Sequence, residues 1–293
     1  MMENSKIVEI LNRDLQDEHG AIIQYLGHAY AMEEGEMACE IEAIAREEMR
    51  HLDWLAETIV ELGGAPSMER GTMRKGGKAV TEWMANNVLL EEDAIAHYKE
   101  HIDMIDNPKV KRLLKRILAD EESHHGDFEH FVEKSKREGM KDIRGDRKDD
   151  DAKIMNRGIE HEYTVVLQYM FHSYMSGNHE VKKQLEDQAI NEMQHLGWLA
   201  EEMAGSGGSP VIEHTKVDKS EITSDMLKAD IKIEKEVADT YDHAAKETKD
   251  EGLKELLLRI RDNERYHLDV FNDLLNGEEN KSRTGGDPGS IPG

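Results

Sequence analysis

The chain has little cysteine and proline, and it has no long apolar run. Its 293 residues include one cysteine, Cys39, and five prolines. A single cysteine excludes an internal disulfide framework, a four-cysteine iron site and a Cys-x-x-Cys-His haem attachment, and it fits a reducing cytoplasm, where we expect the protein to be. No run of 18 apolar residues occurs and the N-terminus is polar, so we expect neither a membrane span nor a signal peptide.

Positive charge is also scarce. Lys and Arg number 38 against 63 Asp and Glu, which gives a net charge of -25. Nucleic acids and anionic membranes are bound by basic patches, so we expect neither as a partner. The acidity suits attraction of cations such as ferrous iron, although solvated acidic helix faces explain the charge equally well.

Helical periodicity dominates the chain and alternating, strand-like runs are missing, so the expected fold class is all-α. Glycine and proline end the second helix of each half, at residues 63–66 and 205–210. The expected helices lie at about residues 4–33, 37–62, 80–106, 108–138, 152–176, 179–204, 222–249 and 250–276.

Connector lengths predict how these helices are arranged. Short turns join helices one and two, and helices three and four, so each pair should be antiparallel. Residues 63–79 and 205–221 form connectors of 17 residues each. Such a connector reaches about 55 Å when extended, which exceeds the roughly 39 Å length of a helix of about 26 residues. We therefore expect two tandem four-helix bundles, each with one long crossover between helices two and three.

The two halves repeat each other at an offset of 144 positions before the crossover and 143 after it. Residues 48–57, EMRHLDWLAE, match residues 192–201, EMQHLGWLAE. The tail lacks periodicity and contains Gly, Pro and Ser, so we expect it to be disordered. The expected domains are a first bundle at 1–140, a linker at 141–151, a second bundle at 152–276 and the tail at 277–293.

One set of six candidate metal ligands occurs in each half. Each set is a glutamate, a Glu-x-x-His, a second glutamate and a second Glu-x-x-His, spread over four helices. Residues three apart share a helix face, so a bundle can direct four carboxylates and two imidazoles to one interior point, which suits a pair of divalent ions. Two such ions neutralise four carboxylates that otherwise repel one another. The sets are Glu18, Glu48, His51, Glu91, Glu121 and His124, then Glu162, Glu192, His195, Glu234, Glu264 and His267.

The fourth helix offers two overlapping Glu-x-x-His registers. Glu121 and His124 share an apolar stripe with Ile117, Phe128 and Phe131, and they match Glu264 and His267 in the repeat. The register of residues 122 and 125 follows a poorer stripe, so we choose Glu121 and His124. The competing interpretation is that all these glutamates are partly exposed and merely solvated.

Four tyrosines lie seven residues after a candidate ligand glutamate, on nearly the same helix face. They could donate hydrogen bonds to ligand carboxylates or pass single electrons, and a plain core role is the alternative. These candidate catalytic residues are Tyr25, Tyr98, Tyr169 and Tyr241.

At these motifs the chain resembles the ferritin-like superfamily, and most closely the bacterioferritins, over about residues 5–135 and 153–275. The resemblance implies a diiron centre in each half that oxidises Fe(II) with O2 or H2O2. It implies terminal ligands Glu18, Glu91, His51 and His124, with bridging Glu48 and Glu121. In the second half it implies terminal Glu162, Glu234, His195 and His267, with bridging Glu192 and Glu264.

Bacterioferritins also bind haem through a methionine directly after the helix-two glutamate. Met49 and Met193 occupy this place, so the resemblance implies a haem between the domains. Fusion of two bundles departs from the one-bundle family pattern and leaves a mineral-storing shell an open question.

Three interpretations stay open on the sequence, and oxidation of Fe(II) is the first. Manganese fits the ligand types as well as iron, so a manganese catalase-like peroxide dismutation is a second enzymatic interpretation. A non-enzymatic iron storage or delivery module is a third, and a homo-oligomer is compatible with each.

Overall fold

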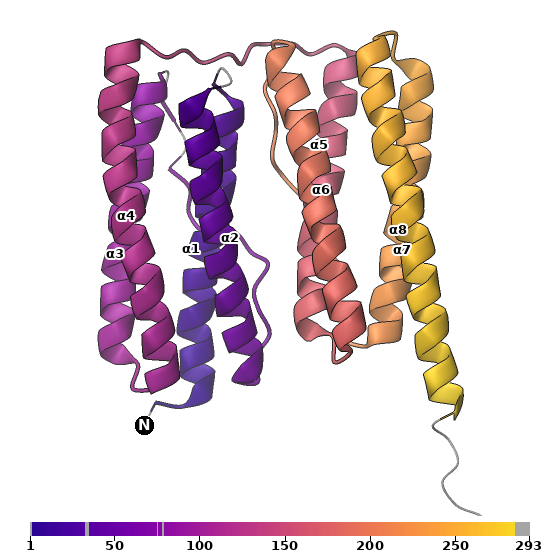
Figure 1. The fold of residues 1–293 in the computed structure, drawn as a ribbon, viewed down its shortest axis with the longest axis horizontal. Helices are drawn as coiled ribbons and strands as arrows, with labels where there is room; N and C mark the ends of the chain where they lie inside the picture. Colours follow the sequence, from indigo (N-terminus) through magenta and orange to yellow (C-terminus); the bar gives the residue numbers. More distant parts are fainter. Residues whose placement is uncertain (1, 33–34, 75, 78, 285–293) are drawn as a thin grey trace, which may run out of the picture. The chain divides into compact units, whose positions relative to one another are not determined.

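The computed structural model describes residues 2–32, 35–74, 76–77 and 79–284, and eight α-helices build this part of the chain (Figure 1). The expected all-α fold class is confirmed. The helices are α1 (Asn4–Tyr30), α2 (Glu36–Glu61), α3 (Val80–Met104), α4 (Pro108–Glu138), α5 (Asp150–Met175), α6 (His179–Gly205), α7 (Thr223–Glu247) and α8 (Glu251–Thr284).

The chain divides into two compact units, residues 1–147 with 203–210 and residues 148–202 with 211–293.

The largest departure from the expected elements is at the end of α8. This helix continues through Thr284, beyond the end expected at residue 276. Glu, Lys and Arg in this stretch favour a helix, and Glu278 accepts a 2.6 Å hydrogen bond from the side chain of Asn178. Residues 285–293 of the expected disordered tail lie outside the described residues.

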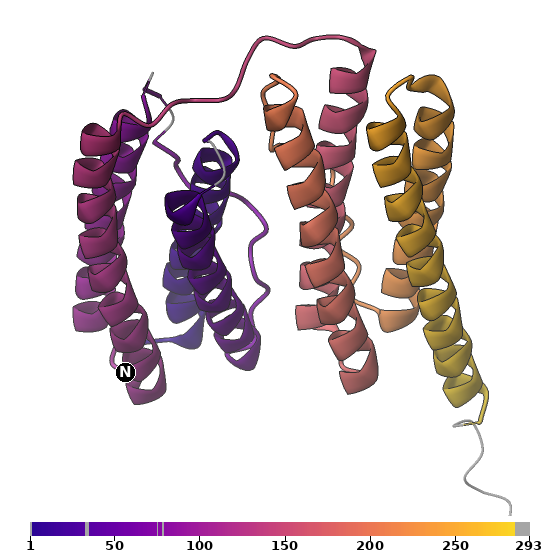
Figure 2. The same ribbon diagram turned by 45° about the horizontal axis from the view of Figure 1, so that its top comes forward.

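In the first bundle, α1 packs on α2 and α3 packs on α4, and further contacts join α1 to α3 and α2 to α4. The described part of the connector, residues 63–74, 76–77 and 79, runs along the bundle toward the end where α3 begins (Figure 2). Gly71 lies against α1 and donates a 2.7 Å backbone hydrogen bond to Gln16. A Cβ atom at this position would lie 2.6 Å from the carbonyl oxygen of Gln16, so glycine is required.

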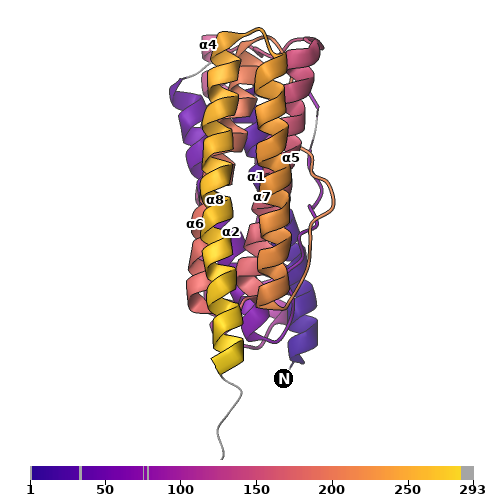
Figure 3. The same ribbon diagram turned by 90° about the vertical axis from the view of Figure 1, so that its right-hand side faces the viewer.

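A glutamine side chain holds the crossover in each bundle. The oxygen Oε1 of Gln24 accepts from the backbone nitrogen of Arg74 at 2.6 Å. At the equivalent position, Oε1 of Gln168 accepts from the backbone nitrogen of Asp218 at 3.0 Å. Figure 3 shows the second connector beside its helices. The same contact therefore holds the crossover at equivalent positions in the two bundles. In each bundle the crossover leads to the third helix, so that four helices surround the bundle core.

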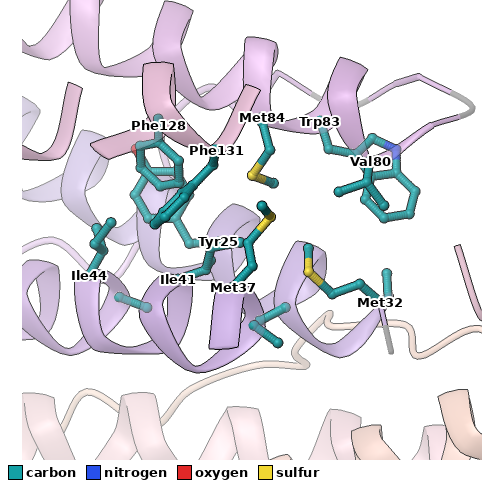
Figure 4. Packing of buried hydrophobic residues seen from close by; sticks show 14 of the residues in the cluster. Tyr25, Met32, Met37, Ile41, Ile44, Val80, Trp83, Met84, Phe128 and Phe131 are labelled. Atoms are coloured by element: carbon teal, nitrogen blue, oxygen red, sulfur yellow. The ribbon is translucent and has the colours of Figure 1, made fainter. Parts of the chain in front are cut away.

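The core of the first bundle sets the register of the ligand-bearing helices. Phe128, one turn after His124, lies against Tyr25 with ring centroids 4.7 Å apart. Met37 and Met84 face each other beside this aromatic pair (Figure 4). At the start of α4, the side chain of Asn107 accepts from two backbone nitrogens, which caps the helix and fixes where it begins. No helix in the described ranges is both long and apolar enough to cross a membrane.

Candidate metal centres

All six candidate ligands of each half lie in the interior of their bundle. Each of the twelve side chains is at most 4% exposed. In the first bundle, ligand atoms of Glu18, Glu48, His51 and Glu121 all lie within 4.8 Å of one another, and so do those of Glu48, Glu91, Glu121 and His124. Glu48 and Glu121 belong to both groups, which is the arrangement that two bridging carboxylates need.

The second bundle repeats this arrangement. Glu162, Glu192, His195 and Glu264 form one group within 4.8 Å, and Glu192, Glu234, Glu264 and His267 form the other. The shared pair here is Glu192 and Glu264. In the first half, the rejected register points elsewhere, because His125 lies near the surface beside Glu92, 3.6 Å away.

Burial and mutual repulsion shape the acidity of the first centre. Burial, followed by the charges of neighbouring carboxylates, raises the pKa values of Glu18 and Glu91. Burial also opposes ionisation of Glu48, but the nearby imidazoles of His124 and His51 outweigh it and lower the pKa of Glu48. Protons therefore balance the buried charges when no metal is bound.

The histidines carry part of this positive charge. Burial alone lowers the pKa of His124, but its contacts with Glu48 and Glu121 outweigh burial and raise the pKa to about 10. In the second centre, contacts of His267 with Glu192, Glu234 and Glu264 likewise raise its pKa, to about 12. Each centre is a cluster of acids and bases held together by shared protons.

Several ligand atoms have no hydrogen-bond partner, although they are buried. They include Oε1 of Glu48, Oε2 of Glu91 and Nδ1 of His124, and the corresponding atoms of Glu192, Glu234 and His267. Nδ1 of His124 lies 3.0 Å from Oε1 of Glu48 without the alignment of a hydrogen bond. Carboxylate oxygens and imidazole nitrogens that crowd one buried point without aligned hydrogen bonds fit a cation, so the residues present suit a metal pair.

The outward ring nitrogens of the first two histidines each face a carboxylate. Nε2 of His51 lies 3.3 Å from Oδ2 of Asp120, and Nε2 of His124 lies 3.0 Å from Oε2 of Glu47. A carboxylate at the outer nitrogen directs the inner nitrogen, Nδ1, toward a metal. Sequence reasoning missed Asp120 and Glu47. A signal for both exists, since each directly precedes the glutamate of a Glu-x-x-His.

The second centre lacks these two carboxylates. Asn263 and Asn191 occupy the positions of Asp120 and Glu47. The amide nitrogen of Asn263 lies 3.0 Å from Nε2 of His195. The two centres thus share their six inner side chains and differ in the charge behind the imidazoles.

All four candidate tyrosines donate a hydrogen bond to a carboxylate of the cluster. The Tyr25 hydroxyl donates to Glu91 and that of Tyr98 donates to Glu18. In the second bundle Tyr169 donates to Glu234, and Tyr241 donates to Glu162. Burial, followed by the charge of the neighbouring glutamate, raises the pKa of each tyrosine, so the phenols remain protonated donors. Each hydroxyl fixes the carboxylate of a facing helix.

A pocket of about 670 Å³ leads from the surface to the first centre, between α1, α3 and the crossover. The carboxylates of Glu18, Glu91 and Glu121 line its inner part. Met49 and Met193, the two haem candidates, are half-buried on α2 and α6, so neither belongs to the fully buried core.

Comparison with known proteins places this geometry in a family. The Ferritin-like domain family matches residues 8–138 and again residues 152–280. The bacterioferritin of Desulfovibrio desulfuricans is 34% identical over 139 residues, an alignment that covers 43% of this chain and 74% of the relative.

Two solved structures are similar to one half of the chain. The Desulfovibrio desulfuricans bacterioferritin, solved with its diiron site in different catalytic states, has 30% identity and a TM-score of 0.44, covering 46% of this chain and 82% of that one. Rhodobacter capsulatus bacterioferritin, solved with a metal-free dinuclear site and haem iron, has 26% identity and a TM-score of 0.42, covering 47% and 89%. The chain belongs to the Ferritin-like domain family and carries that domain twice.

Proposed function

We propose that each bundle binds two iron ions and oxidises Fe(II) with O2 or H2O2. The observation that carries this proposal is the pair of overlapping ligand groups in each bundle, which share two carboxylates and contain buried atoms without hydrogen-bond partners. The relative from Desulfovibrio desulfuricans, whose structure contains a diiron site, supports iron as the metal.

The proposal gives each ligand a role. Glu48 and Glu121 occur in both groups of the first centre and would bridge the two ions. Glu18 with His51, and Glu91 with His124, each occur in one group and would bind one ion apiece. In the second centre Glu192 and Glu264 would bridge, and the terminal ligands would be Glu162, His195, Glu234 and His267.

Two Fe(II) ions held by these residues would supply two electrons, which with two protons from water would convert O2 to H2O2, or H2O2 to two water molecules. The protein residues manage position and protons. Tyr25 and Tyr98 hold Glu91 and Glu18, so both terminal carboxylates are oriented before a cation arrives. Because ligands must be deprotonated to bind metal, the protons shared within the cluster leave as iron enters. The same tyrosines contact ligands, and we propose that they also pass single electrons.

The test is metal content together with oxidation of Fe(II). We expect about four iron ions per chain, because each of two centres holds a pair. The double variant His51→Ala with His195→Ala should lose most oxidation, whereas His125→Ala, which changes a histidine outside the cluster on α4, should retain it. Undiminished oxidation in the double variant would refute the proposal.

The same experiment separates the alternatives. Nitrogen and oxygen ligands also suit manganese. Oxygen gas released from H2O2 by manganese-loaded protein, without Fe(II) turnover, would establish a catalase-type reaction instead. Iron bound at the expected stoichiometry but oxidised no faster than in buffer would establish a storage or delivery module.

We further propose haem as a second cofactor, with Met49 and Met193 as the candidate methionine ligands. The Rhodobacter capsulatus relative contains haem iron. Both methionines are half-buried on helix surfaces, where a thioether can reach a group outside its own bundle. Haem titration should give an absorption spectrum of methionine-ligated haem that is changed in Met49→Ala. An unchanged spectrum in this variant would exclude the assignment.

A further inference from the structure

Asp14, Asp17 and His97 line the pocket of the first bundle outside its six-residue centre, and His101 contacts Asp14. Asp14 and Asp17 lie on α1, and His97 and His101 lie on α3. We propose that these four residues, here named the mouth cluster, bind a divalent transition-metal ion and deliver it to the first centre. Binding of the ion stands on these residues alone, and delivery rests on the function proposed above.

The mouth cluster is organised by two carboxylate–imidazole contacts. Oδ1 of Asp14 lies 2.7 Å from Nδ1 of His101, and Oδ2 of Asp17 lies 3.1 Å from Nδ1 of His97. The two imidazole rings stack with centroids 6.2 Å apart and planes inclined by 21°. Carboxylates and imidazoles paired in this way are the ligands that Fe(II) and Mn(II) bind.

Asp14 shows that the group is more than an acidic surface patch. Its side chain is 2% exposed, and its second oxygen, Oδ2, is buried without a hydrogen-bond partner. A buried acceptor that is left without a donor destabilises the fold. Asp14 lines the pocket, where a bound cation would satisfy this oxygen.

The pocket joins the mouth cluster to the first centre. Asp14, Asp17 and His97 line the same cavity as Glu18 and Glu91. Asp14 precedes Glu18 by one helical turn, and Tyr98, next to His97, donates a hydrogen bond to Glu18. Arg74 also lines the pocket, but its charge is paired with Asp93, with Nε 3.1 Å from Oδ2. One cavity therefore joins three residues of the mouth cluster to Glu18 and Glu91.

The second bundle provides a natural comparison. Gly158, His161, Thr240 and Ala244 occupy the positions of Asp14, Asp17, His97 and His101. A Cβ atom on Gly158 would lie 2.7 Å from Cδ1 of Leu199 and 3.1 Å from the Tyr241 hydroxyl, so a carboxylate does not fit there. Both carboxylates and both α3 imidazoles of the mouth cluster are thus replaced in the second half.

The first test measures binding of Mn(II) to the full chain, with free Mn(II) followed by its electron paramagnetic resonance signal. Asp14→Asn combined with His97→Thr should bind one ion fewer than the unmodified chain. Asp17→Asn combined with His97→Thr changes only partly exposed side chains, 41% and 50% exposed, and should show the same loss while the fold is retained. His161→Asn is the control in the second half and should change nothing. Equal stoichiometry in all chains would overturn the proposal.

The second test measures delivery with one centre disabled at a time. His195→Ala leaves the first centre intact, and there the mouth-cluster variants should raise the Fe(II) concentration for half-maximal oxidation by at least about tenfold, with the maximal rate unchanged. His51→Ala leaves the second centre, where the same variants should have no effect. An equal effect in both backgrounds, or none in either, would contradict delivery. The unmodified chain could fail to oxidise Fe(II) while the mouth-cluster variants still bind one Mn(II) ion fewer. That result would support the binding site and reject the proposed function.

Discussion

The Nε2 atom of His51 lies 3.3 Å from a carboxylate oxygen of Asp120, whereas Nε2 of His195 faces the uncharged amide of Asn263 at 3.0 Å. A carboxylate accepts the outer imidazole proton, fixes the tautomer and makes the inner nitrogen a stronger ligand. An amide accepts the same proton only through its oxygen and adds no charge. We therefore predict that the first centre binds metal more tightly than the second.

Exchanging these residues tests that prediction. Asp120→Asn should weaken metal binding at the first centre by about 10–100-fold, the usual effect of removing such a partner. Asn263→Asp should strengthen the second centre. The measurement is anaerobic Co(II) titration followed by visible absorption, with His195→Ala or His51→Ala present to isolate one centre. Asp127→Asn removes the same charge from an exposed position of α4 and is the control. Equal affinities before and after both exchanges would contradict the prediction.

The hydroxyl of Tyr98 supports a second prediction. It donates to Glu18 inside the bundle, so Tyr98→Phe leaves a buried carboxylate oxygen without its donor. The free energy of unfolding of the metal-free protein should fall by about 1–3 kcal/mol. Metal stoichiometry should stay the same, because the hydroxyl is no ligand, and oxidation of Fe(II) should slow because Glu18 is less well oriented.

Chemical denaturation and stopped-flow absorption measure these two effects. Tyr241→Phe should act equally on the second bundle, since Tyr241 donates to Glu162. Tyr266→Phe, at a side chain 63% exposed on α8, should change neither quantity. Unchanged stability and rate in Tyr98→Phe would show that its hydrogen bond has no role.

Helical phase explains how much of the centre could be predicted from the sequence. Glu121 and His124 share a face with Phe128 and Phe131, and all four are buried in the structure. A carboxylate on an apolar stripe is costly unless it has partners, so its position on the stripe predicts that it points inward. That these side chains bind metal stays a prediction.

Residues on outward faces could not be found in this way. Asp120 is 41% exposed, and along the sequence it looks like any solvated acid until the position of the His51 ring is known. Asp14 and His101 are 87 positions apart, so no local pattern joins them. The sequence predicts that α8 ends at residue 276, before its end in the structure at Thr284. The contact that helps to hold this last stretch joins Glu278 to Asn178, 100 positions away, so no local pattern indicates it.

The third prediction concerns how the stability of the metal-free protein depends on pH. In the metal-free first centre, contacts with Glu48 raise the pKa of His124 to about 10, above the value of about 6.5 for an unfolded histidine. Between about pH 6.5 and pH 10, the folded chain therefore keeps a proton on His124 that the unfolded chain releases. Stability from this group is fully present below about pH 6.5 and is lost as the pH rises toward 10.

Metal-loaded protein should lack this loss, because the ions replace the proton at His124. Thermal unfolding of chelator-treated and metal-loaded protein between pH 6 and 10 measures the difference. The affinity for metal should rise over the same interval, since protons compete for Nδ1. A metal-free protein whose unfolding temperature stays level across this interval would contradict the assignment.

His28 supports the last prediction, which concerns acid. Its ring stacks on Trp83 with centroids 5.6 Å apart and planes inclined by 8°, and its Nδ1 lies 3.0 Å from the amide oxygen of Asn87. Burial lowers the pKa of His28 to about 4, and the hydrogen bond with Asn87 does not offset that effect. The folded chain thus excludes a proton that the unfolded chain binds below about pH 6.5. The stabilisation is complete above that pH and disappears as the pH falls through 4, a loss of about 3 kcal/mol.

His28→Gln removes the titrating group and should reduce the loss of stability between pH 6.5 and 4 by about this amount, in denaturant titrations that follow Trp83 fluorescence. Trp54→Phe and Trp198→Phe leave Trp83 as the reporter. His172, the equivalent residue, contacts the carboxylate of Asp230 at 2.9 Å, so His172→Gln changes the second bundle and should leave the Trp83 transition unchanged. If the chain loses the same stability in acid with and without His28, burial of His28 does not exclude the proton.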